Sequence, residues 1–180
     1  GNNIDHRVRQ SDFRGDKYMQ GAPWLGNSIT QLSHLKSVLV VGSTLRKDHQ
    51  LIAQRFRHEV KNGMQLSILN SIDDELLTKV AHKIIVATNG IIESLAKILK
   101  AAIQISGLQV SDEIKPYTDS LVVETNSSPF AIAASLIENT TSASVYLGNL
   151  AQHHPDYSKI TLFLQKYPYI PVRNTFHLSL

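Results

Sequence analysis

A glycine turn followed by two cations is the feature of this sequence best suited to hold a ligand. Its members are Gly42, Ser43, Arg46 and Lys47. The turn lies between an apolar run and a helical pattern, so backbone N–H groups at the positive end of a helix could meet a phosphate there. It has one glycine where a dinucleotide-binding turn has three, and the P-loop pattern is absent. Asp48 also offers its carboxylate to the same N–H groups. We therefore interpret these four residues as a degenerate anion site that has lost its nucleotide.

A second glycine turn, at residues 148–154, carries two histidines and no cation. His153 and His154 could bind a metal ion, but Asp156 is the only carboxylate close to them in sequence, and zinc sites use three or four ligands. We expect both histidines to cap and pack. His58-Glu59 is not followed by a second histidine four residues on, and no G-x-S-x-G motif occurs. The sequence therefore predicts no metal site and no catalytic residue.

The first turn belongs to a βαβ pattern at residues 37–70. Apolar runs at residues 38–41 and 66–69 flank an amphipathic stretch. Asp48 is the expected N-cap of the helix between them, and Gly63 is its expected left-handed stop. Apolar side chains recur at every fourth position of that helix and are expected to face a sheet: Ile52, Phe56 and Val60. This pattern predicts a parallel sheet, in which ligands bind at the carboxyl ends of the strands.

Further elements are predicted on either side of this unit. Before the first strand we expect a short helix capped by Ser28, with Ile29, Leu32 and Leu35 on one side. After the second strand we expect a short helix at 73–81, a strand at 83–87, and a helix capped by Thr88 or Asn89 that runs to about Ile105 and is ended by Gly107. An irregular stretch at 108–128 then leads to a nearly buried helix from Ser128-Pro129, a strand at 144–147, and a helix opened by Pro155-Asp156 that bears Ile160, Phe163, Leu164 and Tyr167. The last strand, glycine turn and helix repeat the order found at residues 38–60.

Together these elements predict an α/β fold: one three-layer, Rossmann-like domain with a mostly parallel sheet. We place the domain at residues 28–167, after an extended lead-in at 1–27 and before a tail at 168–180 that we expect to be truncated. The chain opens without a methionine, which indicates a piece of a longer protein. The 180 residues and 42% hydrophobic content suffice for one full core.

Composition limits the possible functions. The chain has no cysteine, so it can form neither disulfides nor thiolate clusters. No apolar run reaches the roughly 20 residues that cross a bilayer, so we expect a soluble piece. The formal net charge is +3, and the basic excess lies mostly before Gly63, in Arg7, Arg9, Arg14, Arg46, Lys47, Arg55 and Arg57. We interpret this region as a solvated or protein-facing surface; binding of nucleic acid stays open as an alternative, and it would weaken steeply with salt.

Three segments resemble a known family: GNNIDHRVRQSDF at residues 1–13, VLVVGSTLRKDHQLIAQRFR at 38–57 and YLGNLAQHHPD at 146–156. They look like the molybdopterin-oxidoreductase-like region of the large iron-sulfur subunits of bacterial NADH-quinone oxidoreductase, the respiratory complex I. The resemblance runs from Gly1 to about Tyr167 and implies the fold of the molybdopterin oxidoreductases, such as formate dehydrogenase and DMSO reductase. The three motifs stand in the order and spacing of that family.

The resemblance also implies what this chain has lost. The opening of the pterin enzymes survives as Asn2, Asn3 and Asp5, but Thr44-Leu45 replaces the Asn-Pro of their first turn, and the second turn lacks one glycine. The resemblance thus implies a non-catalytic, cofactor-free structural or assembly domain within an enzyme that transfers electrons from NADH to quinone. Its partners would be other peripheral-arm subunits, on the cytoplasmic side of the bacterial inner membrane, with iron-sulfur clusters elsewhere in the parent subunit. The alternative is a domain that still binds a nucleotide or a pterin dinucleotide.

Overall fold

A parallel sheet forms the centre of the computed structural model, which describes residues 12, 14, 28–107, 109, 112–165 and 175–177. Its described strands are β1 (Ser37–Val41), β2 (Gln65–Asn70), β3 (His82–Ile85), β4 (Ala143–Leu147) and the three-residue β5 (Thr175–His177). They lie in the order β3-β2-β1-β4-β5, and every neighbouring pair is parallel. The predicted α/β class with a parallel, Rossmann-like layout is therefore confirmed.

The central strands are apolar along their length because helices cover both faces of the sheet. Every residue of β1 and β4 is buried. Successive side chains alternate between the faces: Leu39 and Val41 join one apolar cluster, whereas Val38 and Val40 join the other. The continuous apolar runs in the sequence thus reflect burial on two sides.

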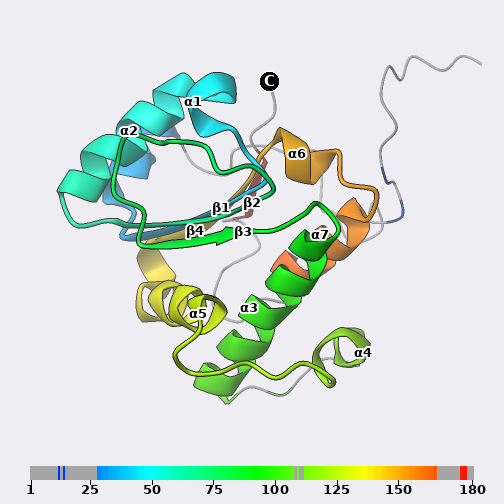
Figure 1. The fold of residues 1–180 in the computed structure, drawn as a ribbon. Helices are drawn as coiled ribbons and strands as arrows, with labels where there is room; N and C mark the ends of the chain where they lie inside the picture. The colour runs from blue at the N-terminus through cyan, green and yellow to red at the C-terminus, as the bar shows by residue number, and fades with distance from the viewer. Residues whose placement is uncertain are drawn as a thin grey trace, which may run out of the picture.

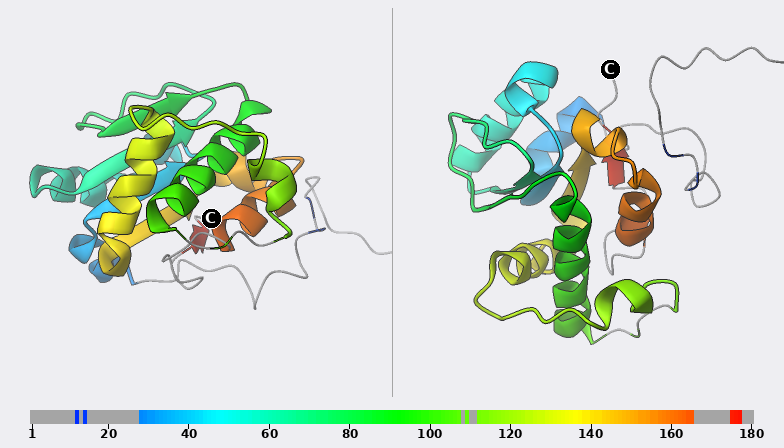
Figure 2. Two further views of the ribbon diagram at one scale, coloured as in Figure 1. Left: turned by 90° about the horizontal axis from the view of Figure 1, so that it is seen from below. Right: turned by 45° about the vertical axis from the view of Figure 1, so that its right-hand side comes forward.

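The helices form two outer layers, which Figure 1 shows above and below the sheet. The described helices on one face are the 3-10 helix η2 (Ile29–His34), α1 (Leu45–Asp48) and α2 (Gln50–Lys61), which pack in the cluster that contains Phe56. Those on the other face are α3 (Gly90–Ser106), α5 (Ser128–Glu138) and α7 (Tyr157–Gln165). Shorter elements complete the described part: α4 (Lys115–Thr118), η3 (Thr140–Ser142) and α6 (Asn149–Gln152). The views in Figure 2 show α4 beside α3, at the edge of the lower layer.

Most predicted helix ends are confirmed. Ser28 forms a capping box with Gln31 at the start of η2. Gly63 and Gly107 follow α2 and α3 with φ of +101° and +67°, a conformation that glycine adopts without steric cost. The helix predicted to begin near Thr88 or Asn89 runs one residue past Ile105. The spacing of apolar residues and the glycine stops were sufficient for these elements.

The helix predicted at residues 73–81 is wrong. This connection between β2 and β3 has no helix, and its last residue, Ala81, donates its N–H to Leu66 O at 2.7 Å. Its apolar side chains also split between environments. Leu76 is buried, whereas Ile72 and Leu77 are 50% and 55% exposed, and Leu77 has φ of +53°. The apolar residues of this segment therefore never form one buried face.

Three smaller predictions are also wrong. Asp48 does not cap the helix that follows it, because it ends α1 and its carboxylate bonds back to Thr44. Residues 108–128 are not wholly irregular, since Pro116 lies in the first turn of α4. Ile29 does not join Leu32 in the core and is 42% exposed. For Asp48, the contact with Thr44 outweighs the capping pattern on which the prediction rested.

Few residues near the two ends of the chain are among those that the structure describes. Of the lead-in at 1–27, only Asp12 and Arg14 are described, and the opening Asn2, Asn3 and Asp5 lie outside the described residues, as does Tyr167. Strand β5 lies within the segment 168–180, which was predicted to follow the domain, and it pairs with β4. No helix in the described ranges has both the length and the apolar character needed to cross a membrane.

Candidate functional site

The two glycine turns meet at the point where the strand order reverses. β1 pairs with β2 on one side and with β4 on the other, so Val41 lies opposite both Leu69 and Leu147 at the strand ends. In open α/β sheets, ligands bind in a crevice outside the carboxyl ends of the strands at this switch point. The turns after β1 and β4 are therefore the place to look for a dinucleotide.

These turns are bonded directly to each other. The N–H of Gly148 donates to Val41 O at 2.9 Å, and the N–H groups of Leu150 and Ala151 donate to Gly42 O at 2.9 and 3.3 Å. A Cβ on Gly42 would lie 2.5 Å from Ala151 N, and a Cβ on Gly148 would lie 2.2 Å from Ser43 Cβ. The glycines thus permit direct contact between the two backbones at the switch point.

The residues of the predicted anion site do not converge on one point. Gly42 and Ser43 are buried between the turns. Arg46 donates to Glu75 O at 2.6 Å, and Lys47 is exposed. At the start of α1, the N–H of Thr44 donates to Asp48 Oδ2 at 3.3 Å, and the Thr44 hydroxyl bonds the same oxygen. The chain's own carboxylate thus occupies the donors that a phosphate would need.

The two histidines of the second turn bond the protein backbone. His153 Nδ1 lies 2.8 Å from Asn149 O. The buried His154 accepts the N–H of Asp156 at Nδ1 and donates from Nε2 to Thr88 O, both at 3.0 Å. This pair of bonds requires the neutral ring with its proton on Nε2. His154 therefore ties the start of α3 to the start of α7. In the described part of the chain, no three potential metal-binding side chains cluster.

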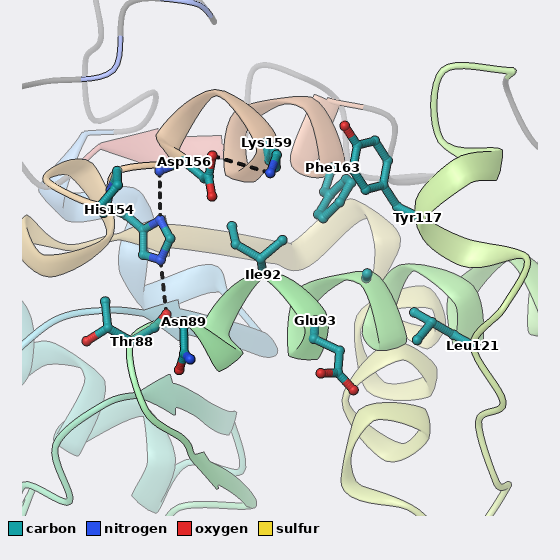
Figure 3. A pocket seen from close by; sticks show the side chains of 12 residues that line it. Thr88, Asn89, Ile92, Glu93, Tyr117, Leu121, His154, Asp156, Lys159 and Phe163 are labelled. Carbon is teal, nitrogen blue, oxygen red and sulfur yellow. Dashed lines mark hydrogen bonds and ion pairs between the residues drawn. The ribbon is translucent and has the colours of Figure 1, made fainter.

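A cavity of about 590 Å³ opens between α3, α4 and α7 (Figure 3). Its walls are Thr88, Asn89, Ile92, Glu93, Ala96, Tyr117, Leu121, His154, Pro155, Asp156, Lys159 and Phe163. Tyr117 and Phe163 pack edge to face at one end, with ring centroids 5.3 Å apart. His154 and the Asp156–Lys159 pair lie at the other end, as Figure 3 shows. The cavity is apolar through most of its length and charged at one end.

Two residues of the lead-in close that charged end from outside. The carboxylate of Asp12, whose side chain is 4% exposed, accepts the N–H of Ser158 in the first turn of α7 at 2.8 Å. Arg14 bonds Asp12 at 2.8 Å and Asp156 Oδ1 at 3.1 Å, and it also donates to Pro155 O. Lys159 lies 3.3 Å from the same oxygen of Asp156. Asp156 is therefore shared by two cations.

These bonds shift the pKa values of the carboxyl groups. The hydrogen bonds from Arg14 are the main reason that the pKa of Asp12 lies well below its usual range. Burial raises the pKa of Asp156, but bonds from Lys159 and Arg14 together outweigh it, so the pKa is lowered. Both groups are thus carboxylates at neutral pH. His49, near the first turn, has a lowered pKa because it is partly buried, and the attraction of Asp48 opposes this shift.

Neither the cavity nor the Asp12–Arg14 contact was predicted from the sequence. The cavity combines residues from three helices separated by as many as 75 positions, and no local pattern links them. Arg14 was counted as part of a basic surface, but it and Arg46 are both bonded within the domain. The sequence signal for this region is Asp156, a carboxylate at the start of a predicted helix, where the helix dipole stabilises negative charge.

The fold defines this chain as an α/β protein of Rossmann-like layout whose two switch-point turns are hydrogen-bonded to each other. Beyond that class, neither a scan against protein-family models nor a search of curated proteins found a significant match.

Proposed function

We propose that this chain is a cofactor-free structural and assembly domain in the large iron-sulfur subunit of a bacterial respiratory NADH-quinone oxidoreductase. The observation that carries the proposal is the contact between the two glycine turns. Three backbone hydrogen bonds join the turns at the place where a dinucleotide would lie. A bound dinucleotide would have to break these bonds and displace Asp48 from Thr44. The scaffold of a nucleotide-binding domain is thus combined with a closed binding crevice.

The positions that depart from the pterin enzymes support the same proposal. Leu45, which takes the place of their proline, is 1% exposed and belongs to the apolar cluster around Phe56. Thr44, which takes the place of their asparagine, bonds Asp48. Two positions that would face a cofactor by resemblance have contacts within the domain instead. The contacts of Thr44 and Leu45 within the domain are thus what a cofactor-free domain of this kind would need.

The rest of the proposal concerns the parent protein. Electrons would pass from NADH to quinone through iron-sulfur clusters held elsewhere in the parent subunit, since such clusters need cysteine or histidine ligands and this chain has no cysteine. The domain would pack against other peripheral-arm subunits on the cytoplasmic side of the inner membrane, and it would touch the membrane only through the complex. Exposed cations such as Arg55 and Arg57 on α2 would then face protein or solvent.

The experiment is a mild purification of the tagged, intact protein from its own cells, followed by cross-linking and native mass spectrometry. We expect cross-links from this domain to peripheral-arm subunits of an active NADH-quinone oxidoreductase, and a domain mass without added ligand. Gly148→Leu should reduce incorporation because its side chain forces the turns apart, whereas Gly63→Ala, which strains the backbone at φ +101° but whose Cβ meets no neighbour within 4 Å, should reduce it much less. An active complex without such cross-links would refute the assembly role, and a co-purified pterin dinucleotide or nucleotide would establish the alternative function.

A further inference from the structure

The cavity between α3, α4 and α7 is distinct from the closed switch point, and we propose that it binds a small aromatic carboxylate. Neither Gly42 nor Gly148 lines it. Its volume of about 590 Å³ lies within the range of roughly 300–1,000 Å³ that is usual for small-molecule sites. The inference goes beyond the proposed assembly function, which assigns no ligand to the domain.

The apolar walls select the body of the ligand. Ile92 on α3, Tyr117 on α4 and Phe163 on α7 face the space between these helices (Figure 3), and Ala96 also lines the cavity. Phe163 is 1% exposed, and Tyr117, which packs against it at an interplanar angle of 71°, is 36% exposed at the rim. Aromatic pairs prefer edge-to-face or offset arrangements to face-to-face stacking, and such pairs contribute stability beyond that of their buried area. A flat aromatic ring entering beside Tyr117 would extend this pair.

The charged end selects the head group. Asp156 Oδ1 has two cationic partners, Arg14 at 3.1 Å and Lys159 at 3.3 Å. Lys159 can therefore turn to a ligand anion while Asp156 keeps Arg14 as its partner. The other acid on the wall, Glu93, is paired with Lys97 at 2.7 Å, and in Figure 3 its side chain points away from the Asp156–Lys159 pair. Arg14 bonds Asp12 and Asp156 at once, and Lys97 holds Glu93, so Lys159 is the cation on the cavity wall that can turn to a ligand, and the favoured head group is an anion.

The direction of the helices supports an anionic head at this end. The 17-residue α3 and the nine-residue α7 both begin here, at Gly90 and Tyr157. The amino end of a helix carries partial positive charge, which stabilises a nearby carboxylate. His154 holds the two helix starts together through its bonds to Thr88 O and Asp156 N. The site thus has a polar end at which His154 joins the two helix starts, and an aromatic end at Tyr117 and Phe163.

The test measures binding of 2-naphthoate to the full chain by calorimetry, with 2-naphthalenemethanol as the uncharged probe and decanoate as the aliphatic carboxylate. We expect naphthoate to bind more tightly than either of the other probes. Lys159→Met should weaken naphthoate about 10-fold through loss of a charged hydrogen bond and leave the alcohol unchanged. Ala96→Phe should fill the cavity and abolish both. Lys61→Met, the same charge change on α2 at the other face of the sheet, should change neither.

Binding to wild-type protein is also mapped by amide chemical shifts, so the test does not depend on the folding of Ala96→Phe. We expect naphthoate to shift the amides of α3 and α7 next to the cavity. The proposal is overturned by no binding at millimolar naphthoate, by shifts confined to other elements, or by a Lys159→Met variant that binds naphthoate as well as Lys61→Met does. Tighter binding of decanoate than of naphthoate would refute the aromatic class.

Discussion

The closed switch point can be tested by comparing Gly42→Ala with Gly107→Ala. The two glycines have nearly the same backbone conformation, with φ of +59° and +67°. A Cβ on Gly107 would meet nothing within 4 Å, whereas a Cβ on Gly42 would lie 2.5 Å from Ala151 N and 2.9 Å from Ala151 Cβ. The difference between the two variants therefore isolates the contact between the turns from the cost of the left-handed backbone.

The size of that difference follows from the geometry. The left-handed conformation costs alanine about 1–2 kcal/mol at either position. At Gly42, overpacking against backbone adds about 1–3 kcal/mol, and the bonds that Gly42 O accepts from Leu150 and Ala151 must lengthen. We therefore expect Gly42→Ala to lower the free energy of unfolding by about 2–3 kcal/mol more than Gly107→Ala does.

The assay is equilibrium unfolding in urea followed by far-UV circular dichroism, with wild type and both variants at one pH and temperature. Similar m values in all three would show that the unfolded states are comparable. If the two variants unfold within about 0.5 kcal/mol of each other, well below the difference expected from overpacking, then the turns do not pack against each other in solution. The crevice would then be open to a dinucleotide, contrary to the proposed function.

Three other perturbations test the contacts around the cavity and the first turn. His154→Ala should lower the free energy of unfolding by about 1–3 kcal/mol in urea, because the buried ring and its two hydrogen bonds are lost, while His153→Ala at an exposed position should cost below about 1 kcal/mol. Asp12→Asn should lower the free energy of unfolding by its full amount above about pH 4, and the difference from wild type should shrink as the pH falls further. The reason is that the lowered pKa of Asp12 confines its stabilising contribution to the ionised form. Urea midpoints of both proteins between about pH 2 and 7 measure this difference. Wild type should lose stability relative to His49→Gln as the pH falls below about 6.5, because the unfolded chain binds the proton that the partly buried ring resists; equal midpoints at pH 7.5 and 5.5 in both proteins would contradict this.

The centre of the parallel sheet was predictable because β1, β2 and β4 are buried on both faces. Such strands are apolar without alternation, and four of the five described ones stand out as short apolar runs between turn signals. Strand β5 carries no such signal, since Thr175 and His177 are polar. Its place follows from pairing with β4, a contact between segments 30 positions apart in sequence. Local patterns therefore predict the centre of this sheet and miss its edge.

Tertiary contacts explain both the helix that was wrongly predicted at residues 73–81 and the contact of Asp12 and Arg14 with α7 that was not predicted. The spacing of Leu76 and Val80 is helical, yet both pack on the sheet from a connection that has no helix. Asp12 and Arg14 belong to a polar stretch without any periodic pattern, and their partners Asp156 and Ser158 lie more than 140 positions away. Propensity describes what a segment can do alone, and at these positions the partners decide the outcome.

The two glycine turns show why the motif alone could not decide between a bound and a lost ligand. A glycine after a strand is needed wherever another group must approach the backbone closely, and the sequence does not say whether that group is a pyrophosphate or a second turn. Here the approaching groups are Ala151 at Gly42 and Ser43 at Gly148. This mutual packing requires both glycines whether or not a cofactor binds. The two glycines are therefore evidence for the scaffold, while evidence for a ligand must come from N–H groups that have no partner within the protein. At this site the N–H of Thr44 is bonded to Asp48, and the N–H groups of Leu150 and Ala151 are bonded to Gly42 O.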